Sequence, residues 1–224
     1  MILKLLCHLL GPPDKHKFEL SYWQHYYLEN GGRFDYSSYR KKMLGMAEEN
    51  DSRFLEDKVV ADFGCGPRGS LCWVKSAEEL IGIDVLADDY VFLFDLSSQS
   101  MRYVKSSEMH IPLPSCYVDV LFTMNAIDHV ENFEVMCKEL LRVLKPGGSF
   151  LGSFNLDMPA TITEPQTLTE ERIKEHLLAC LEVQSYRMAS PGPPDKGEYY
   201  HFFDNSPPPT TGPRFLWVRA TKPI

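Results

Sequence analysis

A glycine-rich loop directly after an apolar run is the clearest chemical feature of the sequence. Gly64, Gly66 and Gly69 follow the run 59–63 with the spacing G-x-G-x-x-G. Glycines in such a loop permit a tight turn and let a ligand approach the backbone closely, near the first turn of a helix. The residues therefore predict a ligand-binding turn between a strand at 59–63 and a helix at 70–80.

Two acidic residues define the chemical class of that ligand. Asp84 stands 22 residues after Asp62, at the end of a second apolar run, where a carboxylate can accept hydrogen bonds from both hydroxyls of a ribose. Asp62 precedes Gly64 by two residues, where its charge would repel a pyrophosphate but could hold an ammonium group. A nucleoside cofactor with a cationic amino-acid end, such as S-adenosylmethionine (SAM), fits better than a nicotinamide dinucleotide. The dinucleotide stays an alternative, because a lone G-x-G-x-x-G is a weak signal.

These residues need a sheet to position them, and the region 57–160 alternates short apolar runs with helical stretches. This alternation indicates βαβ units and a parallel sheet. From 133 to 144 the apolar residues recur at helical spacing, until Lys145-Pro146-Gly147-Gly148 ends the helix. The strands expected in this region are 59–63, 81–85, 118–124 and 149–155.

The C-terminal part predicts one more helix and two more strands. Thr167-Leu168-Thr169-Glu170 has the form of a capping box and opens a helix that runs through Leu181. The strands 183–188 and 214–220 follow without a helix between them, so they are most easily paired antiparallel. A proline-rich excursion with the aromatic stretch 199–203 joins these two strands.

Aromatic residues dominate two helical stretches before the first strand. The first contains Glu19, Tyr22, Trp23, Tyr26 and Tyr27 and ends at Gly31-Gly32, and the second contains Tyr36, Tyr39, Met43 and Met46. We therefore expect residues 1–50 to form an N-terminal helical cap and residues 51–224 to form the main domain of one compact unit.

Composition restricts the partners. The chain of 224 residues has 44% hydrophobic and 24% charged residues, which is typical of a globular protein with a sizeable core. Its net charge of −8 makes a nucleic-acid partner unlikely, because phosphate binding requires a basic surface. The acidic balance instead favours a small-molecule acceptor.

The cysteines and the apolar N-terminus bear on the compartment. The six cysteines are scattered, with no spacing typical of zinc ligands, so we expect no metal site and reduced thiols in a cytoplasmic protein. The apolar run 1–10 is short, contains Lys4 and His8 and lacks a cleavage site, which favours a docked terminal helix over a signal peptide. No stretch approaches the length that spans a bilayer.

Several blocks, taken in order, resemble the class I SAM-dependent methyltransferases, and particularly the branch called methyltransferase type 11. Each block is a modest signal, but their joint order and spacing over roughly residues 57–156 are specific. The matching blocks are 59–66 (VVADFGCG), Ile83-Asp84, 111–114 (IPLP), 118–122 (VDVLF) and 142–148 (RVLKPGG).

The resemblance implies a Rossmann-like, doubly wound α/β fold whose seven-stranded sheet is mostly parallel with an antiparallel last strand. It also implies that SAM is the cofactor and S-adenosylhomocysteine the product. The cofactor-binding positions it implies are Asp62, Gly64, Cys65 and Gly66 at the methionine end, Asp84 at the ribose, Val85, Ser107, Glu108 and Met109 at the adenine, and Asn125 facing the sulfonium.

The acceptor side offers weaker candidates. His129 follows the strand 118–124 and is a candidate general base, because its ordinary pKa lies near neutrality. A role of Asp128 and His129 in capping and orienting the next helix fits slightly better than a role in catalysis. Candidate substrate-binding residues are Asn155, Glu164, Tyr199, Tyr200 and His201, although the aromatic ones fit a satellite core equally well.

The sequence thus predicts a SAM-dependent methyltransferase (a transferase) that acts on a small-molecule acceptor, with O-methylation favoured over N- or C-methylation. One alternative is a methyltransferase-like binding or scaffold protein without activity. The intact Asp62, Gly64, Gly66 and Asp84 speak against that alternative, because a scaffold has no need of cofactor ligands. A less favoured alternative is the NAD-dependent oxidoreductase.

Overall fold

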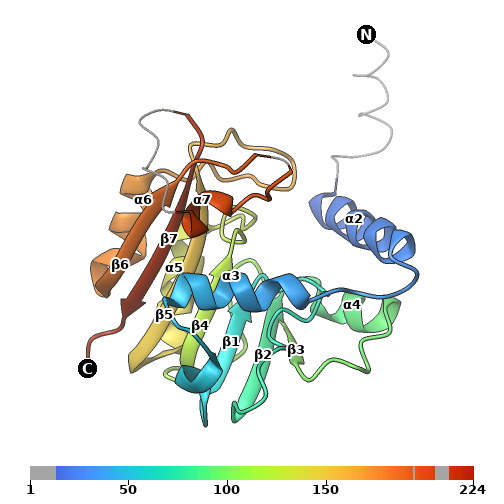
Figure 1. The fold of residues 1–224 in the computed structure, drawn as a ribbon, viewed down its shortest axis with the longest axis horizontal. Helices are drawn as coiled ribbons and strands as arrows, with labels where there is room; N and C mark the ends of the chain where they lie inside the picture. The colour runs from blue at the N-terminus through green and yellow to red at the C-terminus, as the bar shows by residue number, and fades with distance from the viewer. Residues whose placement is uncertain (1–13, 194, 205–211) are drawn as a thin grey trace.

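A seven-stranded sheet with helices on both faces forms the body of the protein (Figure 1). The computed structural model describes residues 14–193, 195–204 and 212–224. The strand order is β3-β2-β1-β4-β5-β7-β6. The strands are β1 Val59–Phe63, β2 Glu79–Asp84, β3 Arg102–Lys105, β4 Val118–Met124, β5 Leu144–Leu156, β6 Glu182–Ala189 and β7 Arg214–Thr221.

The sheet confirms the predicted mostly parallel topology with an antiparallel end. The pairs β1·β2, β1·β4, β2·β3 and β4·β5 are parallel, whereas β7 runs antiparallel to both β5 and β6. From β1 the chain adds β2 and β3 on one side of the sheet and then β4 and β5 on the other, so the strand order reverses between β1 and β4. In open α/β sheets, ligands bind outside the carboxyl ends of the strands at such a switch point.

Six α-helices and two short 3-10 helices surround the sheet in the described part of the chain. The predicted helices before β1 and after β4 are confirmed. The helices are α2 Lys15–Glu29, α3 Ser37–Ala47, α4 Ala87–Leu93, α5 Phe133–Val143, α6 Glu170–His176 and α7 Tyr200–Phe203, with η1 Ser52–Leu55 and η2 Leu178–Cys180.

Two helix predictions were wrong in detail. Residues 70–78 form turns, with hydrogen bonds from Cys72 N–H to Gly69 and from Val74 N–H to Leu71, and no helix follows the glycine loop. The buried residues of this segment are 70–72 and 74, which lie next to one another in the sequence instead of three or four residues apart as on the buried face of a helix. The second case is α6, which is capped by Thr169 rather than Thr167 and ends at His176.

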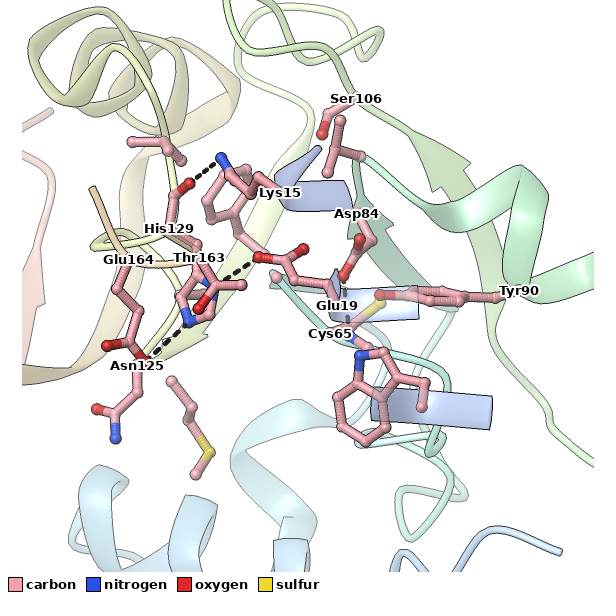
Figure 2. A pocket seen from close by; sticks show the side chains of 18 of the residues that line it. Lys15, Glu19, Cys65, Asp84, Tyr90, Ser106, Asn125, His129, Thr163 and Glu164 are labelled. Atoms are coloured by element: carbon pink, nitrogen blue, oxygen red, sulfur yellow. Dashed lines mark hydrogen bonds and ion pairs between the residues drawn. The ribbon is translucent and has the colours of Figure 1, made fainter. Parts of the chain in front are cut away.

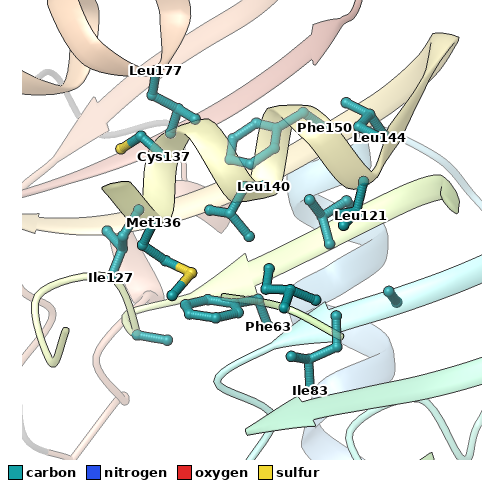
Figure 3. Packing of buried hydrophobic residues seen from close by; sticks show 14 of the residues in the cluster. Phe63, Ile83, Leu121, Ile127, Met136, Cys137, Leu140, Leu144, Phe150 and Leu177 are labelled. Atoms are coloured by element: carbon teal, nitrogen blue, oxygen red, sulfur yellow. The ribbon is translucent and has the colours of Figure 1, made fainter. Parts of the chain in front are cut away.

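The alternation of side chains along the strands builds two cores, one on each face of the sheet. In β1, Val59, Ala61 and Phe63 face the side covered by α5, whereas Val60 faces the side covered by α3. Figure 3 shows Met136, Cys137 and Leu140 of α5 packed over the first of these faces. The two cores fix the positions of the strand ends that carry the candidate site.

Helix α2 is attached differently, because none of its residues is buried. Its aromatic side chains pack beside α4 in a separate cluster, where the Tyr27 ring lies 5.0 Å from the rings of Phe34 and Phe94. Figure 1 shows α2 beside α4, at the edge of the molecule. No helix in the described ranges is long and apolar enough to cross a membrane.

Leu140→Ala is expected to lower the free energy of unfolding by about 2–5 kcal/mol, because Leu140 is fully buried and its loss leaves a cavity in the core. Urea denaturation measures the change. Phe92→Ala is the matched control, since Phe92 is 87% exposed and its removal should cost less than about 0.5 kcal/mol. Equal losses in the two variants would contradict the core assignment.

Candidate active site

A cavity of about 460 Å³ opens at the carboxyl ends of β1, β2 and β4 (Figure 2). Ten of the predicted site residues line it: Gly64, Cys65, Gly66, Asp84, Val85, Ser107, Glu108, Asn125, His129 and Glu164. The cavity therefore brings the predicted cofactor positions together with the candidate base.

The other predicted residues lie elsewhere. Asp62 and Asp128 are buried outside the cavity wall, and Met109 is 52% exposed on its rim loop. Of the predicted substrate residues, Glu164 alone lines the cavity. Tyr199 is part of the core instead. The predicted residues outside the cavity lining are Asp62, Asp128, Met109, Asn155, Tyr199, Tyr200 and His201.

The glycine loop has no room for side chains. Gly64 and Gly66 have φ angles of 69° and 56°, in the left-handed region that disfavours other residues. A Cβ atom on Gly64 would stand 2.1 Å from the Cβ of Ala126. The Gly66 N–H donates to Asp84 Oδ2 at 3.0 Å, which ties the loop to the end of β2. The loop thus presents bare backbone to the cavity.

Gly64→Ala is expected to lower the free energy of unfolding by about 2–5 kcal/mol, because a positive φ and a steric overlap act together. Gly147→Ala is the control, since Gly147 has a φ of 74° but no atom closer than 3.8 Å to an added Cβ. Its loss should be about 1–2 kcal/mol. Urea denaturation compares the two, and similar losses would mean that the loop is less tightly packed against residue 126.

Asp84 is the buried carboxylate beside this loop, with 8% of its surface exposed. Its Oδ1 accepts the Leu86 N–H at 2.9 Å, and its Oδ2 accepts the Gly66 N–H. Burial raises the pKa of Asp84 to about 6, although these two backbone hydrogen bonds work against the rise. A carboxylate has about four acceptor positions, so both oxygens can still accept hydroxyl hydrogens from a ligand.

Asp62 lies behind the loop rather than in the cavity wall. It is 2% exposed, and the Ser70 hydroxyl donates a hydrogen bond to its Oδ2. Burial raises its pKa to about 7, and its Oδ1 has no hydrogen-bond partner among the described residues. Buried carboxylate oxygens are normally satisfied. The free Oδ1 therefore marks a place where a polar ligand group or a bridging water would be stabilised.

Asn125 is fixed by the core on the far side of the cavity. Its side-chain amide donates to the Tyr199 hydroxyl at 2.5 Å, and its Oδ1 accepts from Ser153 Oγ at 3.0 Å. Ser153 Oγ in turn accepts from the Trp217 indole N–H at 3.1 Å. The ring of Phe202 stacks on Trp217 with centroids 4.0 Å apart. The aromatic stretch around Tyr199 thus serves as a core that orients Asn125.

His129 stands between two carboxylates, as Figure 2 shows. Its Nδ1 lies 2.8 Å from Glu19 Oε1, and its Nε2 lies 3.7 Å from Glu164 Oε1. Burial disfavours the charged ring, but the hydrogen bond to Glu19 and the charge of Asp128 outweigh it and raise the pKa of His129. Asp128 is 4% exposed, and burial raises its pKa as well.

Sequence reasoning missed the contribution of α2 to the cavity. Lys15, Glu19 and Trp23 line it, and the Trp23 ring covers Gly66 so closely that an added Cβ would lie 2.9 Å from Cζ2. Their spacing of four residues puts the three side chains on one face of a helix, and this spacing is the signal by which they could have been found. Ser106 and Tyr90 also line the cavity.

The charges of the cavity suit a cationic ligand. Four carboxylates, from Glu19, Asp84, Glu108 and Glu164, face Lys15 and His129 as the only basic side chains in its lining. A pyrophosphate would be repelled by this excess of acid, whereas a sulfonium or ammonium would be attracted. The bare glycine backbone and the carboxylate of Asp84 together fit a nucleoside with a cationic amino-acid end.

Comparisons with known proteins identify relatives of the region that carries the glycine loop. Residues 61–152 match the methyltransferase domain family of type 11. A sterol 24-C-methyltransferase of Pneumocystis carinii is 26% identical over 42% of this chain, and a malonyl-[acyl-carrier protein] O-methyltransferase of Enterobacter lignolyticus is 32% identical over 40%. The chain spans 27% and 36% of the lengths of these two relatives.

The fold comparison reaches further along the chain. A methyltransferase of Haloferax volcanii, solved as a complex with the Trm112 methyltransferase activator, matches with a TM-score of 0.61 and 17% identity. The match covers 96% of this chain and 100% of that one. The match over residues 61–152, the sheet topology and the glycine loop together identify this region as a methyltransferase domain of the type 11 branch, with the class I, Rossmann-like fold.

Proposed function

We propose that this protein transfers the methyl group of SAM to a small-molecule acceptor, with a hydroxyl oxygen as the favoured target. The observation that carries the proposal is the buried Asp84 carboxylate, held beside a bare glycine loop at the end of an acidic cavity. When bound, SAM supplies a methyl group activated by a sulfonium sulfur. Asp84 would accept the ribose hydroxyls, and Gly64 and Gly66 would lie along the methionine end.

The remaining cavity residues divide between cofactor and acceptor. Val85, Ser107 and Glu108 flank the side where the adenine would lie, and Asn125 would face the sulfonium. The acceptor would then lie between His129 and Glu164, beside α2. Because methyl transfer is an in-line displacement, these residues mainly have to align the acceptor and exclude water.

The choice of a small hydroxyl acceptor depends on two features of the cavity. Its volume of about 460 Å³ must hold cofactor and acceptor together, which favours a small molecule. His129 is the one histidine among the described residues that line it, and a hydroxyl is the acceptor that most needs a base. The relatives' names include both a C- and an O-methyltransferase, so the preference for oxygen rests on His129.

The two alternative functions are less well supported. A dinucleotide cofactor would need hydrogen-bond donors for its pyrophosphate, which the N-terminus of a helix directly after the glycine loop usually provides. The described residues 70–78, which follow the loop here, form no helix. A scaffold without activity would have no reason to keep Asp84 buried at a cost. We also propose a cytoplasmic location, supported by the five described cysteines, all of which are free thiols.

Isothermal titration of the full chain tests the proposal. SAM and S-adenosylhomocysteine should both bind, whereas NADH should not. Absence of binding by SAM and S-adenosylhomocysteine at millimolar concentration would overturn the methyltransferase proposal, and tight binding of NADH would support the oxidoreductase.

A further inference from the structure

We propose that Glu19, on helix α2, is a positioning residue that prepares His129 to act as the general base of the reaction. The inference rests on the proposed methyl transfer to a hydroxyl, and it adds a residue from the N-terminal helix to the catalytic arrangement. The carboxylate and the imidazole would form a dyad that exists only while α2 is docked on the domain.

The geometry of the contact fixes the tautomer of the ring. Glu19 Oε1 lies 2.8 Å from His129 Nδ1, and 15% of the Glu19 side chain is exposed. An ionised carboxylate can only accept hydrogen bonds, so Nδ1 must carry the hydrogen. In the neutral ring the lone pair then belongs to Nε2. Glu19 therefore sets which nitrogen can take a proton.

Nε2 is available to the cavity. Its nearest recorded partner is Glu164 Oε1 at 3.7 Å, which is too long for a hydrogen bond. In the described residues no hydrogen bond uses this nitrogen, and 35% of the His129 side chain is exposed. Figure 2 shows the ring directed into the space between Glu19, Glu164 and Asn125. An acceptor hydroxyl in this space could donate its proton to Nε2.

The charged groups around His129 favour its protonated form. Glu19 and Lys15 face it from α2, and Asp84 acts on it from the end of β2. Asp128 and Glu164 act from the two loops beside it. The carboxylates outnumber the one lysine, so the ring has the raised pKa described above and is a stronger base once it is neutral.

The contacts that attach α2 to the domain also involve His129. Lys15 Nζ donates to the backbone carbonyl of His129 and lies 3.2 Å from Glu108 Oε1. Only 10% of the Lys15 side chain is exposed, although α2 has no fully buried residue. The two least exposed charged groups of the helix therefore both contact residue 129, one at its backbone and one at its ring. This convergence is more than the packing of a surface helix requires.

In the proposed methyl transfer, His129 would accept the proton that the acceptor hydroxyl loses. As the hydroxyl oxygen forms a bond to the methyl carbon, the bond from that carbon to sulfur breaks and its electron pair stays on sulfur. The hydroxyl proton moves to His129 Nε2. The resulting imidazolium is stabilised by the Glu19 carboxylate through Nδ1–H, and later releases its proton to water.

Nitrogen-15 NMR of the histidine rings in the free protein tests the dyad without cofactor or acceptor. In the wild type the neutral His129 ring should carry its hydrogen on Nδ1 and titrate with a pKa above 6.5. Glu19→Gln should lower that pKa by about 1 unit or more, because the paired charge is lost. Glu164→Gln is the matched control: its charge lies 3.7 Å away without a hydrogen bond, so it should move the pKa less and leave the tautomer unchanged.

Two outcomes would overturn the inference: a neutral ring protonated on Nε2, or an unchanged titration of His129 in Glu19→Gln. A SAM titration of the wild type separates this failure from that of the proposed function. Binding of SAM with the wrong tautomer removes the inference alone, whereas absence of binding removes the proposed function and the inference with it.

Discussion

Asp84→Ala is expected to weaken SAM binding about 100-fold or more. The carboxylate would accept two ribose hydroxyls, and a hydrogen bond to a charged group is worth about 1.5–3 kcal/mol. The combined loss of about 3–6 kcal/mol corresponds to at least two powers of ten in Kd. The variant also loses the hydrogen bond that ties the Gly66 N–H to β2, so the glycine loop becomes less well ordered for the ligand. Isothermal titration measures the change.

Asp88→Ala is the matched control for this result. It removes one carboxylate four residues away, on the exposed surface of α4, where Asp88 pairs with Lys105 at 3.3 Å outside the cavity. SAM affinity should stay unchanged in this variant, and thermal unfolding should show that both variants fold. Wild-type affinity in a folded Asp84→Ala protein would refute the assignment of the ribose site.

The same carboxylate gives SAM binding a pH dependence of definite sign. Because burial raises the pKa of Asp84 to about 6, the group is charged above this pH and neutral below it. Affinity for the cationic cofactor should therefore fall as the pH drops below about 6. Asp84→Ala should lose this part of the dependence, and titrations at several pH values check it.

The sheet could be predicted from the sequence because its strands are buried on both faces. Runs such as Val59–Phe63 and Val118–Met124 are almost continuously apolar, and the structure has both strands with these bounds. The glycine loop and Asp84 were predictable for a related reason, since the loop directly follows the apolar strand β1 and Asp84 ends the apolar strand β2. The part of the cavity formed by the glycine loop and Asp84 is therefore encoded locally.

The part of the cavity around His129 could not be predicted in the same way, because it depends on contacts between distant segments. Glu19 meets His129 across 110 residues of chain, and no local pattern records that meeting. The turns at 70–78 show the same limit, because tertiary contacts as well as the local pattern decide whether a segment forms a helix or a series of turns. Tyr199 was ambiguous because an aromatic stretch can line a pocket or fill a core, and only its contact with Trp217 decides that.

His129→Gln is expected to lower turnover about 100- to 10,000-fold while leaving SAM affinity close to that of the wild type, because general-base catalysis contributes about this much. Turnover is measured as release of S-adenosylhomocysteine with a hydroxyl compound that the wild type methylates.

The pH profile of turnover gives a second check on His129. A base must be neutral, so wild-type turnover should rise with pH through the raised pKa of His129, and the variant should lose this rise. His25→Gln is the matched control, since His25 lies on α2 with 73% of its side chain exposed, and its ion-pair partner among the described residues is Glu29. It should keep wild-type turnover. If His129→Gln kept it as well, at every pH tested, His129 would be a structural residue that anchors α2 through Glu19, and the acceptor would have to be one that needs no base.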